Sequence, residues 1–154
     1  MPSSLPVQGL EELPGYYIRR LQQIAVGIFL DETAHENITP VQFALLFAAS
    51  RQAGLDQRTL AARIGLDTST VGTVIDRLET RALIQRQVAP DDKRVRLLSV
   101  TPEGAQLLER VVPAMLRAQD RMLAPLAPAE RPKFMAMLKR IVEQNQAWSR
   151  AAKD

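Results

Sequence analysis

The sequence predicts a mainly α-helical fold that carries one two-stranded β-hairpin. Apolar side chains follow a helical spacing over most of the 154 residues, whereas only residues 83–100 read as two short strands. Two short helices joined by a tight turn directly precede this hairpin, and the hairpin tip is charged. Aromatic residues make up only 5% of the chain against 46% hydrophobic residues, which indicates helices packed through aliphatic side chains. Two short helices followed by a β-wing form a winged helix-turn-helix, an arrangement that reads duplex DNA.

Two helices are expected ahead of this unit. The first runs from Glu12 to Glu32, and its segment 25–30 (AVGIFL) is apolar nearly all round, so this helix should be buried on more than one side. Pro40 opens a second helix that continues to Ala53. The apolar side chains at helical spacing in the first helix include Tyr17, Leu21, Ile24 and Ile28, and those expected to face inward in the second are Phe43, Leu46 and Phe47.

The first helix of the helix-turn-helix pair has a short apolar face and a defined end. Leu60, Ala61 and Ile64 form the face. Gly65 follows them, and glycine can end a helix in the left-handed conformation without steric cost. A side-chain oxygen of Asp67 or Thr68 is expected to cap the next helix.

The second helix of the pair has a buried face and a polar face. Its aliphatic residues at i, i+3, i+4 and i+7 are Val71, Val74, Ile75 and Leu78. The remaining face carries Thr68, Ser69, Thr70, Gly72, Thr73, Asp76 and Arg77. Small hydroxyl side chains near a helix N-terminus suit a major groove, where they bond bases or phosphates. Glycine inside a helix costs about 1 kcal/mol relative to alanine, so Gly72 predicts a close approach to DNA or to another helix. The alternative is a packed helical hairpin without a DNA role.

The hairpin is expected to form the wing. Its strands cover about 83–88 and 95–100, with Val95, Leu97 and Ser99 on one face of the second strand, and the segment 90–93 (PDDK) has the residues of a turn. The tip therefore presents Asp92, Lys93 and Arg94. A cation at such a tip suits the negative potential of a minor groove, and Asp92 is expected to pair with Arg94 and fix the shape of the tip. The alternative for both cations is an ordinary solvated turn.

Two more helices are expected after the wing. One begins at Thr101-Pro102 and runs to about Leu126, with Pro113 as a kink, and the last runs from Pro128 to about Ala151. Together with the first helix they lie outside the winged unit, and their apolar faces need a partner. A second copy of the chain is the simplest partner, and terminal helices that pack only on each other within a monomer are the alternative.

Charge and residue counts exclude several classes of function. The net charge of +3 and the pI near 9.7 fit a nucleic-acid partner. The chain has no cysteine, no apolar run that could span a bilayer and no evident signal peptide, so we expect a cytoplasmic protein without disulfides. With a single histidine, His35, we expect no enzyme and no cofactor. Metal binding by His35 with Asp31, Glu32 or Glu36 is the alternative to a solvated helix end.

The run from Leu60 to Gly104 resembles the MarR (multiple antibiotic resistance regulator) family. That family's helix-turn-helix and strand entry are matched by LAARIGLDTSTVGTVIDRLETRALIQR, and its wing and following helix by PDDKR and LLSVTPEG. The family's second helix is matched by ITPVQFALL at 38–46. The resemblance implies a single domain over 1–154. Within it, about 38–100 form the DNA-binding lobe, and 10–36 and 102–151 are helices that join two chains as a homodimer.

The resemblance also implies roles for individual residues. Major-groove contacts would come from Ser69, Thr70, Gly72 and Thr73, a backbone contact from Arg77, and the minor-groove contact from Arg94, oriented by Asp92. Many family members carry serine and then arginine where this chain has Gly72-Thr73. This departure shifts weight from base readout by a long side chain to contacts from the backbone and the wing.

A small-molecule site is predicted from the first helix. Tyr17, Arg20 and Ile24 share a face, and a guanidinium matches a carboxylate bidentately. With His35 and Phe43, they are expected to hold an aromatic carboxylate. The alternative is interface packing for the tyrosines and solvent or DNA contact for the arginines. The segment PGYYIRRLQQIAV with ITPVQFALL is most similar to regulators of aromatic or nicotinate-type acid catabolism.

The sequence thus predicts a homodimer that binds a pseudo-palindromic operator in double-stranded DNA, represses transcription, and is released by an aromatic carboxylate. A regulator controlled by a protein partner or by its own level is the alternative. Metal sensing at His35 is a further alternative function.

Overall fold

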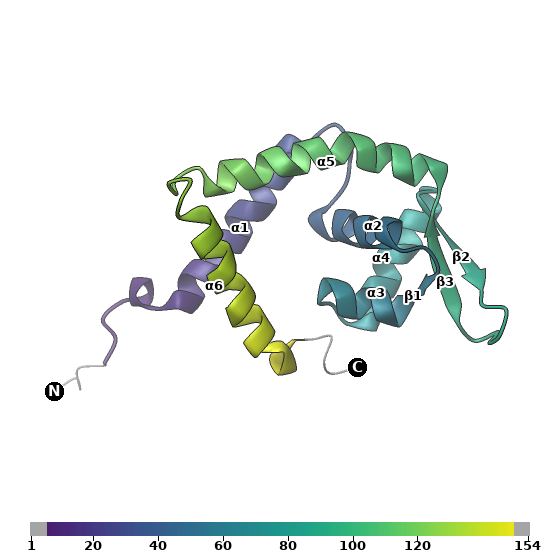
Figure 1. Cartoon of the computed structure of the whole chain (residues 1–154), viewed down its shortest axis with the longest axis horizontal. Helices are drawn as coiled ribbons and strands as arrows, with labels where there is room; N and C mark the ends of the chain where they lie inside the picture. Colours follow the sequence, from purple (N-terminus) through teal and green to yellow (C-terminus); the bar gives the residue numbers. More distant parts are fainter. Residues whose placement is uncertain (1–5, 150–154) are drawn as a thin grey trace.

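The computed structural model describes residues 6–149, and their fold is mainly helical (Figure 1). The elements are η1 (Leu10–Glu12), α1 (Pro14–Glu32), α2 (Pro40–Arg51), β1 (Leu55–Asp56), α3 (Gln57–Ile64), α4 (Thr68–Thr80), β2 (Ile84–Val88), β3 (Arg96–Val100), α5 (Pro102–Leu123), α6 (Arg131–Gln144) and η2 (Gln146–Trp148). Figure 1 shows α5 as a long bridge that joins the sheet at one end and the turn into α6 at the other. The helix-turn-helix lobe of α2, α3, α4 and the sheet is thus attached to the terminal helices by one continuous helix.

The sheet has three strands rather than the two that the sequence predicts. Its order is β1-β3-β2, and both pairs are antiparallel. In the wing, Ile84 pairs with Val100 and Val88 with Arg96. The core side of β3 is occupied by the buried Leu98 and the half-buried Val100, while Leu97 lies on the alternate face. The missed strand β1 is two residues long, which is too short to show any alternation.

The hydrophobic core lies in the helix-turn-helix lobe and continues along α5. Its largest fully buried side chains are Leu45, Leu46, Leu60, Ile75, Leu78, Ile84, Leu98, Val71 and Val111. The predicted inward positions of α3 and α4 are therefore confirmed, with Ile64 and Val74 packed partly buried against them. Phe47 was expected to point inward, but 39% of it is exposed, beside the cavity between α2 and α5. In α1 only Phe29 is buried, so the expected burial of this helix on more than one side is not found within one chain.

Close backbone contact fixes α5 to the lobe. The Thr101 hydroxyl accepts from the Gly104 N–H at 3.0 Å and donates to the Ala82 carbonyl at 2.6 Å. A Cβ at Gly104 would overlap the Leu83 carbonyl oxygen, so this approach requires glycine. Pro113 lies inside α5, which continues past it. The start of α5 is thereby bonded directly to Ala82 and Leu83, between α4 and the wing.

Some helix boundaries differ from the expected ones. The first helix begins at Pro14 after a short 3-10 turn, α2 ends at Arg51, and α5 ends at Leu123. The last helix covers only Arg131–Gln144, and the expected end at Ala151 lies outside the described residues. Before α6, residues 128–130 form a turn in which the Glu130 carboxylate accepts from the Ala127 N–H at 2.7 Å. No helix within 6–149 is long and apolar enough to cross a membrane.

Candidate nucleic-acid interface

A capping side chain begins α3, and a glycine ends it at the turn into α4. The Asp56 carboxylate accepts from the Thr59 N–H at 2.7 Å, and Gly65 ends α3 with φ 74° in the left-handed region, as predicted. The Leu66 N–H then bonds the Ala61 carbonyl at 3.0 Å. This turn points the polar face of α4 away from the core. On that face Ser69, Thr73, Asp76 and Arg77 are exposed, and Thr68, Thr70 and Gly72 are half-buried.

Asp67 is the cap of α4, which settles the choice left open between it and Thr68. Its carboxylate accepts from the Thr70 N–H at 2.7 Å, from the Thr70 hydroxyl at 2.8 Å and from the Ser69 hydroxyl at 2.9 Å. These bonds, the one from the Thr70 backbone first, lower the pKa of Asp67 to about 2. An ionised carboxylate only accepts, so both hydroxyl protons point to Asp67, and the oxygen lone pairs remain for another donor.

The Asp67 cap has a measurable consequence for stability. The folded-state pKa lies below the ordinary 3.8, so the cap's stabilisation is complete above about pH 4 and is lost as the pH falls toward 2. We expect Asp67→Ala to lower the midpoint of thermal unfolding by roughly 2–4 °C at neutral pH. The gap from wild type should close between pH 4 and 2. Asp91→Ala, at an exposed turn position, is the control. A gap that stays constant across this range would contradict the assignment.

Gly72 makes room for a side chain of α3. Gln57 donates from its amide Nε2 to the Thr68 carbonyl at 3.1 Å, and a Cβ at Gly72 would lie 2.7 Å from that nitrogen. The sequence left two explanations for this glycine, close approach to DNA or to another helix. The contact with Gln57 shows that α3 makes the close approach. Gln57 locks α3 to the first turn of α4, a contact that the sequence alone does not indicate.

The wing tip has the geometry expected for a presented arginine. Asp92 accepts from the Arg94 N–H at 2.9 Å and from its guanidinium at 3.2 and 3.4 Å. These contacts lower the pKa of Asp92, the backbone bond having the larger effect. The predicted pairing is thus confirmed. The Arg94 side chain nevertheless remains 91% exposed, so the tip is pre-shaped while its charge faces solvent. Arg96 steadies the same turn by donating to the Lys93 carbonyl at 2.7 Å.

Two arginines outside the predicted set connect α4 to its surroundings. Arg81 donates to the backbone carbonyls of Asn37 at 2.6 Å and Glu36 at 3.3 Å. Arg86, on β2, forms ion pairs with Asp76 at 2.6 Å and Glu79 at 3.2 Å. The i, i+3 spacing of these two carboxylates is visible in the sequence, but their partner on a strand is not.

The predicted ligand residues are not brought together within one chain. Arg20 donates to the Tyr16 hydroxyl at 2.9 Å, so its partner is Tyr16 rather than Tyr17, whose side chain is exposed. Phe29 comes twelve positions after Tyr17 in α1, which corresponds to a distance of about 18 Å along the helix axis. Phe43 lies beside Phe29, with 5.8 Å between ring centroids. His35 follows the other end of α1 and is exposed.

The acidic residues around His35 are paired with arginines of α5. Asp31 binds Arg121 at 2.6 Å, Glu32 binds Arg117 and Arg121 at 2.9 Å each, and Glu36 binds Arg110 at 3.1 Å. The arginine bonds lower the pKa of Glu32. No group of three or more histidine, cysteine or acidic residues within 6–149 is arranged to hold a metal ion. These carboxylates instead form ion pairs that connect the end of α1, and Glu36 just after it, to α5.

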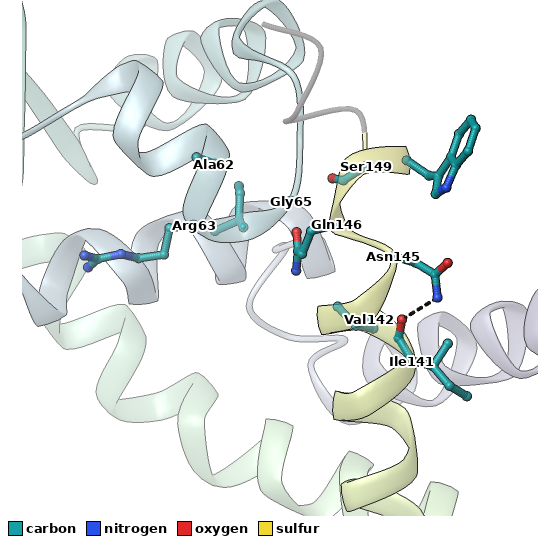
Figure 2. Close-up of a pocket in the computed structure, with 10 residues that line it drawn as sticks. Ala62, Arg63, Gly65, Ile141, Val142, Asn145, Gln146 and Ser149 are labelled. Carbon is teal, nitrogen blue, oxygen red and sulfur yellow. Dashed lines mark hydrogen bonds between the residues drawn. The ribbon is translucent and has the colours of Figure 1, made fainter.

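Two cavities open beside the lobe. One of about 430 Å³ lies between α2 and α5, and it is lined by Phe47, Ser50, Arg51, Ala105, Leu108, Glu109, Val112 and Pro113. The other, of about 560 Å³, separates the end of α3 from the end of α6. Figure 2 shows Arg63 extending away from the α6 side of that second cavity, while Asn145 turns back to the Ile141 carbonyl at 2.8 Å. The polar groups that line this second cavity do not point to a common centre (Figure 2), so the cavity is a space between α3 and α6 rather than a shaped binding site.

Comparisons with known proteins agree with this geometry. The MarR family model matches residues 38–95. A Thauera aromatica protein assigned to regulation of the hcr operon is 34% identical over 132 residues, which cover 85% of this chain and 80% of that protein.

Two solved structures share the fold. One is the transcriptional repressor CouR of Rhodococcus jostii, bound to a 23-mer DNA duplex; it has a TM-score of 0.82 and 30% identity, over 91% of this chain and 99% of that one. The other is BpsR of Bordetella bronchiseptica, whose DNA binding is regulated by 6-hydroxynicotinic acid; it has a TM-score of 0.83 and 30% identity, over 88% and 96%. The similarity to nicotinate-type regulators is thus confirmed at the level of relatives.

The helix-turn-helix with its capped α4, the wing with its exposed arginine, and these relatives agree on one assignment. The chain belongs to the MarR family of winged helix-turn-helix transcriptional regulators.

Proposed function

We propose that this protein binds a pseudo-palindromic DNA operator as a homodimer, represses transcription there, and is released by an aromatic carboxylate. The observation that carries the DNA-binding part is the exposed polar face of α4 on the same lobe as the 91% exposed Arg94. Together they offer one surface for a major groove and one for the neighbouring minor groove. Binding to chromosomal DNA would place the protein in the cytoplasm.

The α4 residues divide into two groups by what they offer DNA. Ser69 and Thr70 have committed their hydroxyl protons to Asp67, so in the groove they act as acceptors. Cytosine N4 and adenine N6 amino groups are the donors that match them. Thr68, Gly72 and Thr73 allow close backbone approach, while Arg77 and Lys93 supply charge for phosphates. Arg94 is the minor-groove residue in this proposal.

The dimer part of the proposal is supported by the unburied state of α6. Within the described part of the chain, α6 contains no buried residue. Its exposed apolar side chains and those of the N-terminal segment are Met135, Met137, Ile141, Val142, Leu10, Leu13, Tyr17, Ile18 and Ile24. An isolated helix of 14 residues is only marginally stable in water, so α6 needs a partner surface. The segments 10–36 and 102–151 of a second chain are the surface proposed here.

The ligand part of the proposal takes a two-chain form. A carboxylate needs a paired cation when it leaves water, and Arg20 is our candidate for it, with Tyr17 beside it. Phe29, which Phe43 contacts, lies about 18 Å along α1 from Tyr17 and about 14 Å from Arg20. Phe43 is also stacked on Phe47, with 5.6 Å between ring centroids, and Phe47 lines the cavity between α2 and α5. One acid could contact both sets only if α1 of one protomer approached the α2–α5 cavity of the other. His35, which follows the C-terminal end of α1, would complete this site.

A binding screen tests the ligand. We expect calorimetry with benzoates, phenylacetates and pyridine carboxylates to find at least one acid that binds and that lowers operator affinity. Arg20→Ala should abolish this response while DNA binding persists, because Arg20 lies far from the helix-turn-helix in sequence and on a different helix. Arg19→Ala, which removes the neighbouring cation, is the matched control.

The outcomes separate the competing readings. No binding across the panel would reject the ligand and favour control by a protein partner or by the protein's own level. Binding with a normal response in Arg20→Ala, but a lost response in Arg51→Ala, would move the carboxylate site to the α2–α5 cavity. A reporter gene behind the operator tests repression: expression should fall with the protein and recover with the acid, whereas activation would reverse the sign.

A further inference from the structure

Arg86 connects the wing to the DNA-facing helix through three contacts. It stands in the middle of β2, opposite Leu98 of β3. Its guanidinium binds the Asp76 carboxylate at 2.6 Å and the Glu79 carboxylate at 3.2 Å, and it reaches the Gly72 carbonyl at 3.5 Å. The side chain is only 23% exposed, whereas that of Asp76 is 65% exposed. Arg86 therefore reaches α4 from the wing with most of its side chain covered.

The spacing of these contacts fixes an orientation. Gly72, Asp76 and Glu79 lie at i, i+4 and i+7, so they form one stripe along two turns of α4. A planar guanidinium that contacts three points of such a stripe resists both rotation of the helix and bending of the strand away from it. A lysine ammonium lacks this planar fork, so it would not fix the same orientation. The contacts thus set the angle between α4 and the wing.

Arg86 also neutralises acidic groups where DNA would approach. Asp76 shares the polar face of α4 with Thr73 and Arg77. A free carboxylate there would repel phosphates, and its pairing with Arg86 removes much of that repulsion. Two physical effects, orientation and neutralisation, are therefore available to the same side chain, and they can be distinguished by experiment.

We propose that Arg86 is a positioning residue for DNA recognition: it holds the wing at the angle to α4 at which the helix and Arg94 engage one site together. This inference rests on the proposed DNA-binding function and assigns Arg86 no DNA contact of its own. Its partners are Asp76 and Glu79, and its effect on affinity runs through Arg94.

A double-mutant cycle on the operator tests the proposal. Equilibrium binding is measured for wild type, Arg86→Ala, Arg94→Ala and the double variant over a salt titration. We expect Arg86→Ala to weaken binding about tenfold or more, in the range of a lost specific contact. In the Arg94→Ala background, the same change should alter affinity by less than about twofold and leave the salt slope unchanged. Additive losses with a further drop in salt slope would show that Arg86 contacts DNA itself, and would overturn the proposal.

Footprinting supplies a readout that a loss of stability would not produce. In Arg86→Ala, hydroxyl-radical protection of the sugars should disappear at the minor-groove positions of the wing, while the protection of guanine N7 from dimethyl sulfate by α4 in the major groove persists. Uniform weakening at both grooves would contradict a positioning role. Arg110→Ala, which breaks an exposed ion pair on α5, is the control and should bind like wild type.

Two further variants separate orientation from charge and guard against misfolding. Arg86→Lys keeps the positive charge but loses the planar guanidinium. We therefore expect this variant to fold and to lose most of the operator affinity that Arg86→Ala loses. Adding Asp76→Asn and Glu79→Gln to Arg86→Ala removes the unpaired carboxylates. Full recovery in that triple variant would mean that neutralisation alone explains Arg86, and would overturn the positioning claim. Failure of wild type to bind any duplex specifically would instead count against the proposed function.

Discussion

Arg94→Ala should weaken operator binding by about 10- to 100-fold while leaving the fold and the dimer intact. A single specific DNA contact is worth about 1–3 kcal/mol, and a symmetric operator would lose one at each wing. The side chain is 91% exposed and pairs with the neighbouring Asp92, which is itself 42% exposed, so its removal leaves no cavity and no buried unpaired charge. Fluorescence anisotropy with a labelled operator, from about 50 to 200 mM salt, measures both the affinity and its salt slope.

The salt slope distinguishes the kind of contact that Arg94 makes. If the arginine neutralises phosphates, the slope should fall by about 1 for each wing. Arg94→Lys retains the charge but not the planar fork, so it should restore the slope more fully than the affinity. Asp91→Ala at the same turn is the control. Unchanged affinity across the titration would show that the wing tip is only a structural turn.

Ile141→Glu should convert the proposed dimer to monomers at micromolar concentration. Ile141 is 54% exposed on α6, the helix that has no buried residue among those described, so the proposed dimer would bury it. Burying an unpaired carboxylate costs several kcal/mol. Operator affinity should then fall by more than about 100-fold, because two linked half-site contacts become independent. Sedimentation velocity measures the mass, and anisotropy measures the affinity.

Ala136→Glu provides the matched control for this variant. It introduces the same charge on the same helix, but on the side that carries Lys133, Lys139 and Arg140. We expect it to remain dimeric and to bind the operator normally. A dimeric Ile141→Glu, or a monomeric Ala136→Glu, would show that the interface lies elsewhere.

The winged unit could be predicted because its signals are local. Helical spacing of aliphatic residues, Gly65 after α3, a capping carboxylate at Asp67 and the Pro-Asp-Asp turn each act within a few residues of themselves. The Asp92–Arg94 pair is likewise only two residues apart. Such features follow from backbone geometry and side-chain chemistry, and the structure places them as expected.

Contacts between distant segments could not be predicted in the same way. Arg86 lies seven and ten residues from its carboxylate partners, across a turn whose geometry decides whether they meet. Gln57 fills the space at Gly72 only because α3 crosses α4 at that point. The ligand set failed to converge in one chain because Tyr17 lies near the start of α1, whereas Phe43 packs on Phe29 near its end. A periodic pattern identifies a face but not the distance along it.

Selection of DNA from random duplexes tests the central claim most directly. The protein is incubated with the pool, bound duplexes are recovered and amplified over several rounds, and the enriched sequences are determined. A dimer with one capped α4 and one wing per chain predicts an inverted repeat whose half-site centres lie about 10 base pairs, one helical turn, apart. No enrichment over the input pool, or enrichment of a single half-site without its repeat, would contradict a dimeric winged-helix regulator.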